Sequence, residues 1–203
     1  MEFYELHPDN PQFRYINKAV NVLKKGGVII YPTDTVYGIG CDIFNKEALE
    51  KVKLIKTDPD IKLLSFICSN FKDISKYAKL SDYAYRTMKH LLPGPYTFIL
   101  PAAKEVPKKL WSKRKTVGIR IPDNPIALKI VDDLGNPIIS TSTTNRKGEV
   151  LYNPYEIRSI FNSQVDLMLS AGNLSSESSS VIDLSEDKPV LVRKGAGDIS
   201  LFV

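Results

Sequence analysis

Cysteine is scarce in this chain, and long apolar runs are missing. The two cysteines, Cys41 and Cys68, lie far apart, outside any CxxC pair and without a nearby histidine, so neither a zinc site nor a disulfide framework is indicated. No apolar run approaches the ~20 residues that a membrane-spanning helix needs. The N-terminal residues also lack the basic start and apolar centre of a signal peptide. We therefore expect a cytoplasmic protein that has no membrane contact.

The signatures of several large enzyme classes are absent too. The sequence contains no P-loop, no GxGxxG, no HExxH, no nucleophile elbow and no internal repeat. The usual ATPase, dehydrogenase, zinc protease and α/β-hydrolase interpretations therefore lack their motifs.

The composition is that of one globular domain. Of the 203 residues, 43% are hydrophobic and 25% are charged, which is ordinary for a chain with one substantial core. We expect a single domain over residues 1–203. The formal net charge of +5 favours anionic partners such as nucleic acid, although solubility alone also explains an excess of this size.

Residues 26–40, GGVIIYPTDTVYGIG, form the segment around which the rest of the chain is organised. The β-branched run Val28–Tyr31 predicts a buried strand. The polar residues from Pro32 onward, closed by Gly38 and Gly40, predict a loop at its carboxyl end. Ligands of open α/β sheets bind outside the carboxyl ends of the strands. Two interpretations stay open: an ordinary turn, or a ligand-binding loop.

Periodicity and capping residues predict alternating helices and strands along the chain. Asn10 is a candidate N-cap, and Pro11 suits the first position of a helix that ends before Gly26. Further helices are expected at residues 45–55, 75–78, 81–92, 124–134 and 153–161, with a helical turn or two at 106–111. Further strands are expected at residues 41–44, 63–68, 96–100, 116–121, 137–139, 165–169, 181–183 and 190–193.

Two more polar features accompany the predicted strands. Six hydroxyl or amide side chains, Ser140–Asn145, follow the strand 137–139 and repeat the pattern of the first loop. The two strand ends therefore predict one polar pocket with two walls. In the strand 116–121, Arg120 shares a face with Thr116. It is either a rigid clamp for carboxylate or phosphate, or an arginine on an exposed sheet face.

Lysines gather at two further places. Lys56, at the end of the helix 45–55, either complements the helix dipole or points into the crevice of the first loop; Lys62 follows shortly after it. Residues 104–115 carry a basic cluster around Trp111. Such a cluster can hold RNA phosphates and stack a base, and a solvated charged face is the alternative.

Five segments together resemble the YrdC-domain family. They are PTDTVYGIG, PGPYTFIL, TVGIRIP, residues 137–145, and VIDL with the later VLVRKGAG. Within the family, KEVPKKL and the VRKGAGD ending are most similar to the YciO branch. The resemblance implies a single α/β domain, in which a twisted mixed β-sheet is flanked by helices and forms a large positively charged concave cavity. It also implies nucleotide binding and double-stranded RNA binding.

The best-known members of that family make threonylcarbamoyl-AMP from threonine, bicarbonate and ATP for the t6A modification of tRNA. The resemblance therefore implies ATP and L-threonine as ligands, Mg²⁺ accompanying ATP, and double-stranded RNA or tRNA as a partner. It assigns no covalent nucleophile and no metal ligands. By position, it implies substrate-binding roles for Thr35, Arg120, Ser140 and Ser179. It implies nucleotide-binding roles for Lys56, Lys62, Thr116, Ser142 and Arg193.

Two departures from the family pattern bear on the activity. Asp58 stands where the synthases carry the arginine of a KxR element, and a carboxylate there would repel a triphosphate. The family's SxN becomes Ser142 to Thr144, with Asn145 displaced by one residue, which moves its side chain to the other face of a strand unless a bulge compensates.

Three hypotheses follow. The first is a nucleotidyltransferase of the threonylcarbamoyl-AMP synthase type. The second is a YciO-type double-stranded RNA-binding protein that keeps the cavity without synthesis. The third is a stable fold whose former site has drifted.

Overall fold

A computed structural model describes residues 1–55, 64–107, 110, 115–186 and 188–202. The helices are α1 (Phe13–Lys24), α2 (Lys46–Ile55), α3 (Phe71–Tyr77), α4 (Asp82–Leu91), α5 (Pro125–Leu134) and α6 (Pro154–Phe161). The strands are β1 (Glu2–Glu5), β2 (Ile29–Tyr31), β3 (Gly38–Asp42), β4 (Ser65–Ile67), β5 (Tyr96–Pro101), β6 (Thr116–Arg120), β7 (Ile138–Ser142), β8 (Leu167–Ser170), β9 (Ser180–Asp183) and β10 (Val190–Arg193).

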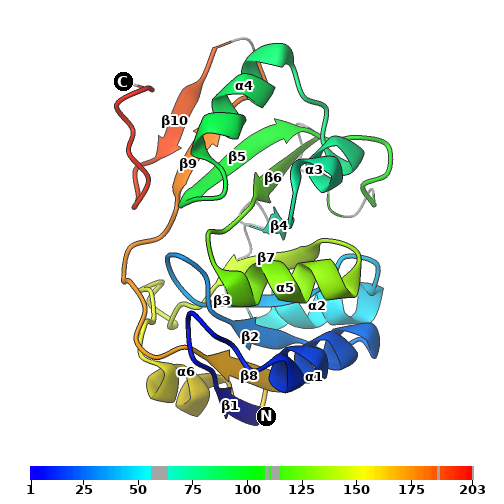
Figure 1. Ribbon diagram of the computed structural model, residues 1–203, viewed down its shortest axis with the longest axis vertical. Helices are drawn as coiled ribbons and strands as arrows, with labels where there is room; N and C mark the ends of the chain where they lie inside the picture. Colours follow the sequence, from blue (N-terminus) through cyan, green and yellow to red (C-terminus); the bar gives the residue numbers. More distant parts are fainter. Residues whose placement is uncertain (56–63, 108–109, 111–114, 187, 203) are drawn as a thin grey trace.

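All of these strands join one mixed sheet of ten strands, in the order β1-β8-β2-β3-β7-β4-β6-β5-β9-β10. The sheet contains parallel pairs, such as β2 with β8 and β4 with β6, and antiparallel pairs, such as β2 with β3 and β3 with β7. Because β2 and β7 both run antiparallel to β3, their carboxyl ends lie at the same edge. The two polar segments that follow these strands therefore start from the same side of the sheet (Figure 1).

One face of the sheet is covered by α1 and α5, which pack against each other and over β2, β7 and β8. The apolar positions of α1 fall on one side, and those of α5 meet them there. Asn124 caps α5 through Ile126 N and Ala127 N, and Gly135 ends the helix with φ +82°, as the sequence predicts.

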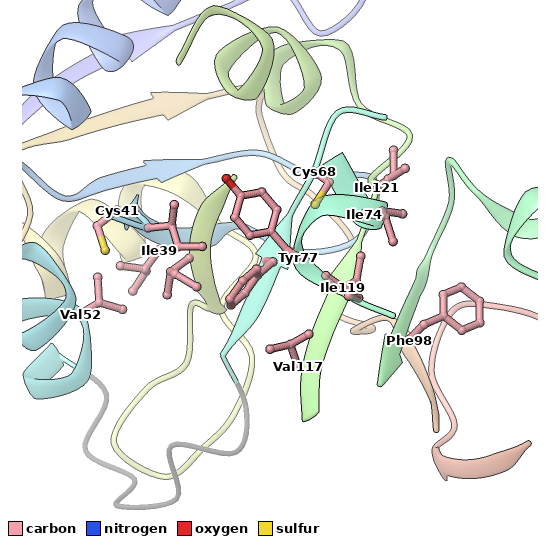
Figure 2. Close-up of a cluster of buried hydrophobic side chains, with 14 of the residues drawn as sticks. Ile39, Cys41, Val52, Cys68, Ile74, Tyr77, Phe98, Val117, Ile119 and Ile121 are labelled. Carbon is pink, nitrogen blue, oxygen red and sulfur yellow. The ribbon is translucent and has the colours of Figure 1, made fainter. Parts of the chain in front are cut away.

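The other face carries a larger apolar cluster under α2, α3, α4 and α6. Figure 2 shows its central part, where Ile39 and Cys41 of β3 approach Val52 of α2, while Ile119 of β6 lies near Ile74 of α3. Alternate residues of β6 thus point into this cluster, and Arg120 points to the opposite face. That orientation places Arg120 on the face that α1 and α5 partly cover, where it pairs with Ile67 of β4.

The structure corrects four predicted boundaries. Helix α1 begins at Phe13, and its N-cap residue, Gln12, makes no side-chain cap bond. The backbone N–H groups of Asp9 and Asn10 donate to His7 Nδ1 instead. The predicted cap at Asn10 and the predicted start at Pro11 therefore lie before the helix. The helix predicted at 75–78 begins earlier, at Phe71, because Asn70 Oδ1 caps it through Asp73 N.

Two strands include residues predicted as loop. Gly38 and Gly40 lie inside β3, and β7 continues through Ser140 to Ser142, because each residue keeps a ladder partner in the neighbouring strand. Strand β1 was not predicted; it is a half-exposed edge strand of four residues, EFYE, whose pattern carries little apolar signal. The predictions for residues 56–63, and for the parts of 106–111 that the structure does not describe, lie outside the described residues.

Among the described residues, no helix combines the length and the apolar character that a bilayer span requires.

Both cysteines are buried free thiols, so they should resist alkylation while the protein is folded. Burial raises the pKa of Cys41 to about 12, and burial also raises the pKa of Cys68 well above its ordinary value. Since the thiolate is the nucleophile, we expect no reaction with a disulfide reagent at pH 8 under native conditions and release of two equivalents after unfolding in guanidinium. A Gln164→Cys variant supplies an exposed positive control. Rapid reaction of the native protein would contradict this burial.

Candidate functional site

A row of small residues crosses the middle of the sheet on the face that carries Arg120. Gly40 of β3 pairs with Ser140 of β7, Ser140 pairs with Ser65 of β4, and Ser65 pairs with Gly118 of β6. Residues in one row point to the same face. Ser65 and Gly118 are half-buried, so no large side chain of the described residues covers this part of the sheet completely.

Tyr31 lies across the glycines at one end of this row. A Cβ on Gly38 would come within 2.9 Å of the Tyr31 ring, and a Cβ on Gly40 would come within 3.3 Å of it. The Tyr31 hydroxyl donates to Ser140 Oγ at 2.7 Å, and Ser140 Oγ donates to the carbonyl of Ile39 at 3.2 Å. Burial raises the pKa of Tyr31, so this hydroxyl stays protonated and fixes the position of the Ser140 side chain.

The segment between β2 and β3 is held in shape by its own threonines. Thr33 Oγ1 donates to the carbonyl of Val36 at 2.6 Å and accepts from Thr35 N at 3.1 Å. Thr35 is only 1% exposed. Its carbonyl accepts from Ser175 N at 3.1 Å. This bond joins the serine-rich segment, residues 175–180, to the loop. The loop is therefore an ordered wall of the site.

Arg120 reaches this loop from β6 and makes the central contact of the site. Its Nη2 donates to Asp34 Oδ1 at 2.5 Å and to Thr35 Oγ1 at 2.8 Å. The side chains of Arg120 and Asp34 are 8% and 10% exposed. Two buried groups on this contact, Arg120 Nε and Asp34 Oδ2, have no hydrogen-bond partner. A buried ion pair with two unused polar atoms is unusual in a purely structural role.

A second group of polar contacts lies at the start of β9. Thr97 Oγ1 and Ser179 Oγ share a hydrogen bond of 2.9 Å, and Arg193 Nη2 donates to the Ser179 carbonyl at 2.8 Å. Burial, and secondarily the charge of Arg120, lower the pKa of Arg193. Thr97 of β5 lies on the same face of the sheet as Gly118. A Cβ built on Gly118 would lie 3.5 Å from the Thr97 methyl group.

The predicted site residues thus fall into three groups. Thr35 and Arg120 are in direct contact, and Ser179 and Arg193 are in direct contact. Ser140, Ser142 and Thr116 lie on the same face of β7 and β6, where Ser142 pairs with Gly38 and Thr116 pairs with Pro101. Lys56, Lys62, Asp58 and most of the basic cluster around Trp111 lie outside the described residues.

Asn145 does not replace the displaced asparagine of the SxN pattern. Its Oδ1 accepts from the backbone N–H groups of Lys147 and Glu149, and its Nδ2 donates to Glu149 Oε2 at 2.7 Å. The amide is therefore used to close a turn. Thr144, two residues after Ser142, is the residue that the resemblance aligns with the asparagine of the family pattern.

Sequence reasoning missed Asp34, Tyr31 and Thr97 as members of this neighbourhood. Asp34 was visible as a carboxylate in a hydroxyl-rich loop, but only the fold shows that its partner is Arg120 on β6. Tyr31 was assigned to the strand as a core residue, and its contact with Ser140 depends on strand pairing. No local pattern distinguishes Thr97 from an ordinary strand residue.

Cation ligands are few in the described part of the chain. It contains no group of three or more His, Cys, Asp or Glu side chains that could hold a metal ion. In the described contacts of Arg120, Ser140 and Ser179, Asp34 is the one carboxylate, and it is paired with Arg120.

A shallow groove of about 640 Å³ lies elsewhere, over α1 and α5, between Phe13, Lys24 and Lys129. It contains none of the predicted site residues. The candidate site is therefore marked by its buried charges and hydroxyls, and not by this groove.

Comparison with known proteins gives a consistent result. The family model Sua5_yciO_yrdC, described as "Telomere recombination", matches residues 21–195. The chain is 44% identical to the uncharacterized protein YciO of Escherichia coli (strain K12) over 204 residues, which cover 100% of this chain and 99% of that protein. It is 35% identical over 156 residues to the threonylcarbamoyl-AMP synthase of Coxiella burnetii (strain RSA 493 / Nine Mile phase I), covering 76% of this chain and 83% of the synthase.

Solved structures agree with this result. The crystal structure of E. coli YciO matches with a TM-score of 0.96 over 100% of both chains. The P. abyssi Sua5 structure complexed with L-threonine matches with a TM-score of 0.89 at 26% identity, covering 96% of this chain and 58% of that one. The predicted fold, a twisted mixed sheet flanked by helices, is confirmed.

Because Tyr31 needs the open surface of two glycines, Gly40→Ala should destabilise the protein. The new Cβ would lie 2.5 Å from Ile138 Cγ2 and 2.9 Å from the carbonyl of Ile139, and such overpacking costs about 1–3 kcal/mol. Urea unfolding measures this loss. Ser65→Ala in the same row is the control, with an expected change within about 0.5 kcal/mol. Equal stability of Gly40→Ala and the parent protein would show that the site tolerates a side chain there.

Proposed function

We propose, from the premise that this chain belongs to the Sua5/YciO/YrdC family, that it binds L-threonine and ATP and forms threonylcarbamoyl-AMP as part of tRNA t6A modification. The observation that carries the proposal is the buried Arg120 side chain, which lies 2.8 Å from the Thr35 hydroxyl with part of its hydrogen-bonding capacity unused. A guanidinium in that position suits the carboxylate of an amino acid.

The surrounding hydroxyls support an amino-acid site. Thr35 is fixed by Thr33 and by the backbone of Ser175, so it can contact a small ligand with little loss of entropy. Ser179 is 4% exposed and is held by Thr97 and Arg193. We infer that these two rigid hydroxyl groups contact the bound amino acid on either side of Arg120.

The nucleotide would lie along the same sheet face, toward Ser142, Thr116 and Arg193. In the proposed reaction the threonine amine adds to carbon dioxide, and the resulting carbamate oxygen attacks the α-phosphorus of ATP while pyrophosphate leaves. Positioning and stabilisation of negative charge supply the rate, with no covalent intermediate on the protein. Among the described residues, Arg193 is the cation that we assign to the phosphates. Lys56 and Lys62 are proposed to supply further positive charge to them. Mg²⁺ accompanying ATP would neutralise phosphate charge.

Loss of Arg120 should abolish threonine-dependent pyrophosphate release. Removal of a charged hydrogen-bond partner costs about 1.5–3 kcal/mol, so Arg120→Lys should lower activity at least about tenfold, and Arg120→Ala further. The assay supplies labelled threonine, bicarbonate and Mg²⁺-ATP and measures pyrophosphate and the carbamoyl adenylate.

The control for this assay is Arg158→Ala, because Arg158 stacks on Phe3 at the far edge of the sheet. Thermal melting confirms that each variant is folded. Full activity of Arg120→Lys would refute the role proposed for Arg120. No product from the parent protein at enzyme concentrations comparable to substrate would refute the synthase assignment.

A second function, RNA binding without synthesis, is favoured by two observations. Identity to YciO is higher and covers the full chain, and Asp58 replaces the arginine of the synthase KxR element. On this alternative the same sheet face and the lysines near it bind the phosphates of an RNA duplex.

The binding of an RNA duplex should then weaken steeply with salt. A protein that neutralises four phosphates loses about a hundredfold in affinity when salt rises fourfold. Fluorescence anisotropy with a short duplex at two salt concentrations measures this slope, and a DNA duplex of equal length is the control. Binding that is absent at low salt, or independent of salt, would exclude this alternative.

A further inference from the structure

We propose that Asp34 determines which ligands Arg120 accepts. It occupies Arg120 in the ligand-free protein, releases that arginine to a ligand carboxylate, and then pairs with the ligand's ammonium group. The site would thus select zwitterionic α-amino acids over anions that lack an amino group. This inference rests on the proposed amino-acid site and adds the residue that sets its specificity.

The hydrogen-bond donors of Arg120 provide the first argument. Nη2 carries two hydrogens, and both have acceptors, Asp34 Oδ1 and Thr35 Oγ1. A two-pronged clamp on a carboxylate uses one hydrogen on Nη2 together with one on Nε or Nη1. Nη2 is therefore fully used in the ligand-free state. A ligand carboxylate can take a two-pronged position only by replacing one of these acceptors, and Asp34 is the acceptor with the same chemistry.

The incomplete pairing of the two side chains provides the second argument. A side-on ion pair would join both oxygens of Asp34 to Nε and Nη2 of Arg120. Here only Oδ1 and Nη2 meet, and both Oδ2 and Nε are buried without a partner. Asp34 therefore holds Arg120 through a single hydrogen bond. Such a pair leaves unused bonding capacity on both partners, which a ligand carrying both charges would complete.

Charge balance provides the third argument. If a plain carboxylate replaced Asp34 on Arg120, the Asp34 side chain would remain as a buried anion without a cation. Breaking a buried pair by removing one partner is strongly unfavourable. An ammonium group on the same ligand removes that penalty. Discrimination of this kind, through the cost of an unpaired charge, is a common source of specificity.

The test compares three ligands that differ by one charged group. L-threonine carries both groups, 3-hydroxybutyrate is threonine without the amino group, and 1-amino-2-propanol is threonine without the carboxylate. Isothermal titration calorimetry gives the affinity of each. For the parent protein we expect threonine to bind at least about tenfold more tightly than 3-hydroxybutyrate.

In Asp34→Asn that preference should fall to within about twofold, because 3-hydroxybutyrate no longer leaves a buried anion behind. Asp133→Asn makes the same chemical change in the more exposed pair with Lys129 and should leave the preference unchanged. If Asp34→Asn fails to fold, Asp34→Glu tests the same idea: its charge is kept, so the preference for threonine should persist with weaker binding. An unchanged ratio in Asp34→Asn, or a lost preference in Asp34→Glu, would overturn the inference.

The outcomes separate this inference from the proposed function. L-serine and L-alanine, with their deaminated analogues, are titrated in parallel. A preference for either of them that Asp34→Asn removes would support the role of Asp34 while refuting threonine as the ligand. Synthesis of the adenylate with an unchanged ratio in Asp34→Asn would refute the role of Asp34 alone. Binding of no zwitterion by the parent protein would overturn both.

Discussion

A guanidinium buried in the sheet is the constraint around which this structure is arranged. A buried charge is tolerated only when it is paired and hydrogen-bonded. Arg120 meets that condition through Asp34 and Thr35, which lie far from it in sequence. The loop between β2 and β3 must therefore stay ordered, and Thr33 and Ser175 provide the bonds that order it.

The sheet face that carries Arg120 has small side chains next to that residue, while α1 and α5 cover apolar residues elsewhere on it. Gly40, Ser140, Ser65 and Gly118 form a row of small residues across four neighbouring strands, while the opposite face is filled by a large apolar cluster. The face opposite Arg120 therefore carries the larger apolar cluster, whereas the face of Arg120 combines a smaller apolar cluster under α1 and α5 with this row of small residues. Tyr31 closes one end of the row and holds Ser140 in place.

Much of this arrangement could be predicted from the sequence because it depends on local patterns. The alternation in the strand 116–121 placed Arg120 opposite the apolar residues, and capping residues located α5 and α6. What could not be predicted depends on pairing between distant strands. The sequence predicts a loop at Gly38 and Gly40. The absence of a side chain at these positions is required by Tyr31 on the neighbouring strand, which only the strand pairing shows. The pairing of Asp34 with Arg120 was invisible for the same reason.

The choice between synthesis and binding depends on charge at the phosphates, more than on the amino-acid end of the site. The proposed threonine contacts of Arg120, Thr35 and Ser179 would be the same in a synthase and in a binding protein. Adenylate formation also needs cations that compensate the charge developing on pyrophosphate. Arg193 would contribute one such charge under the proposed function; burial, and secondarily the charge of Arg120, lower its pKa. Under the proposed function, a phosphate group bound beside Arg193 would offset the repulsion between these two cations.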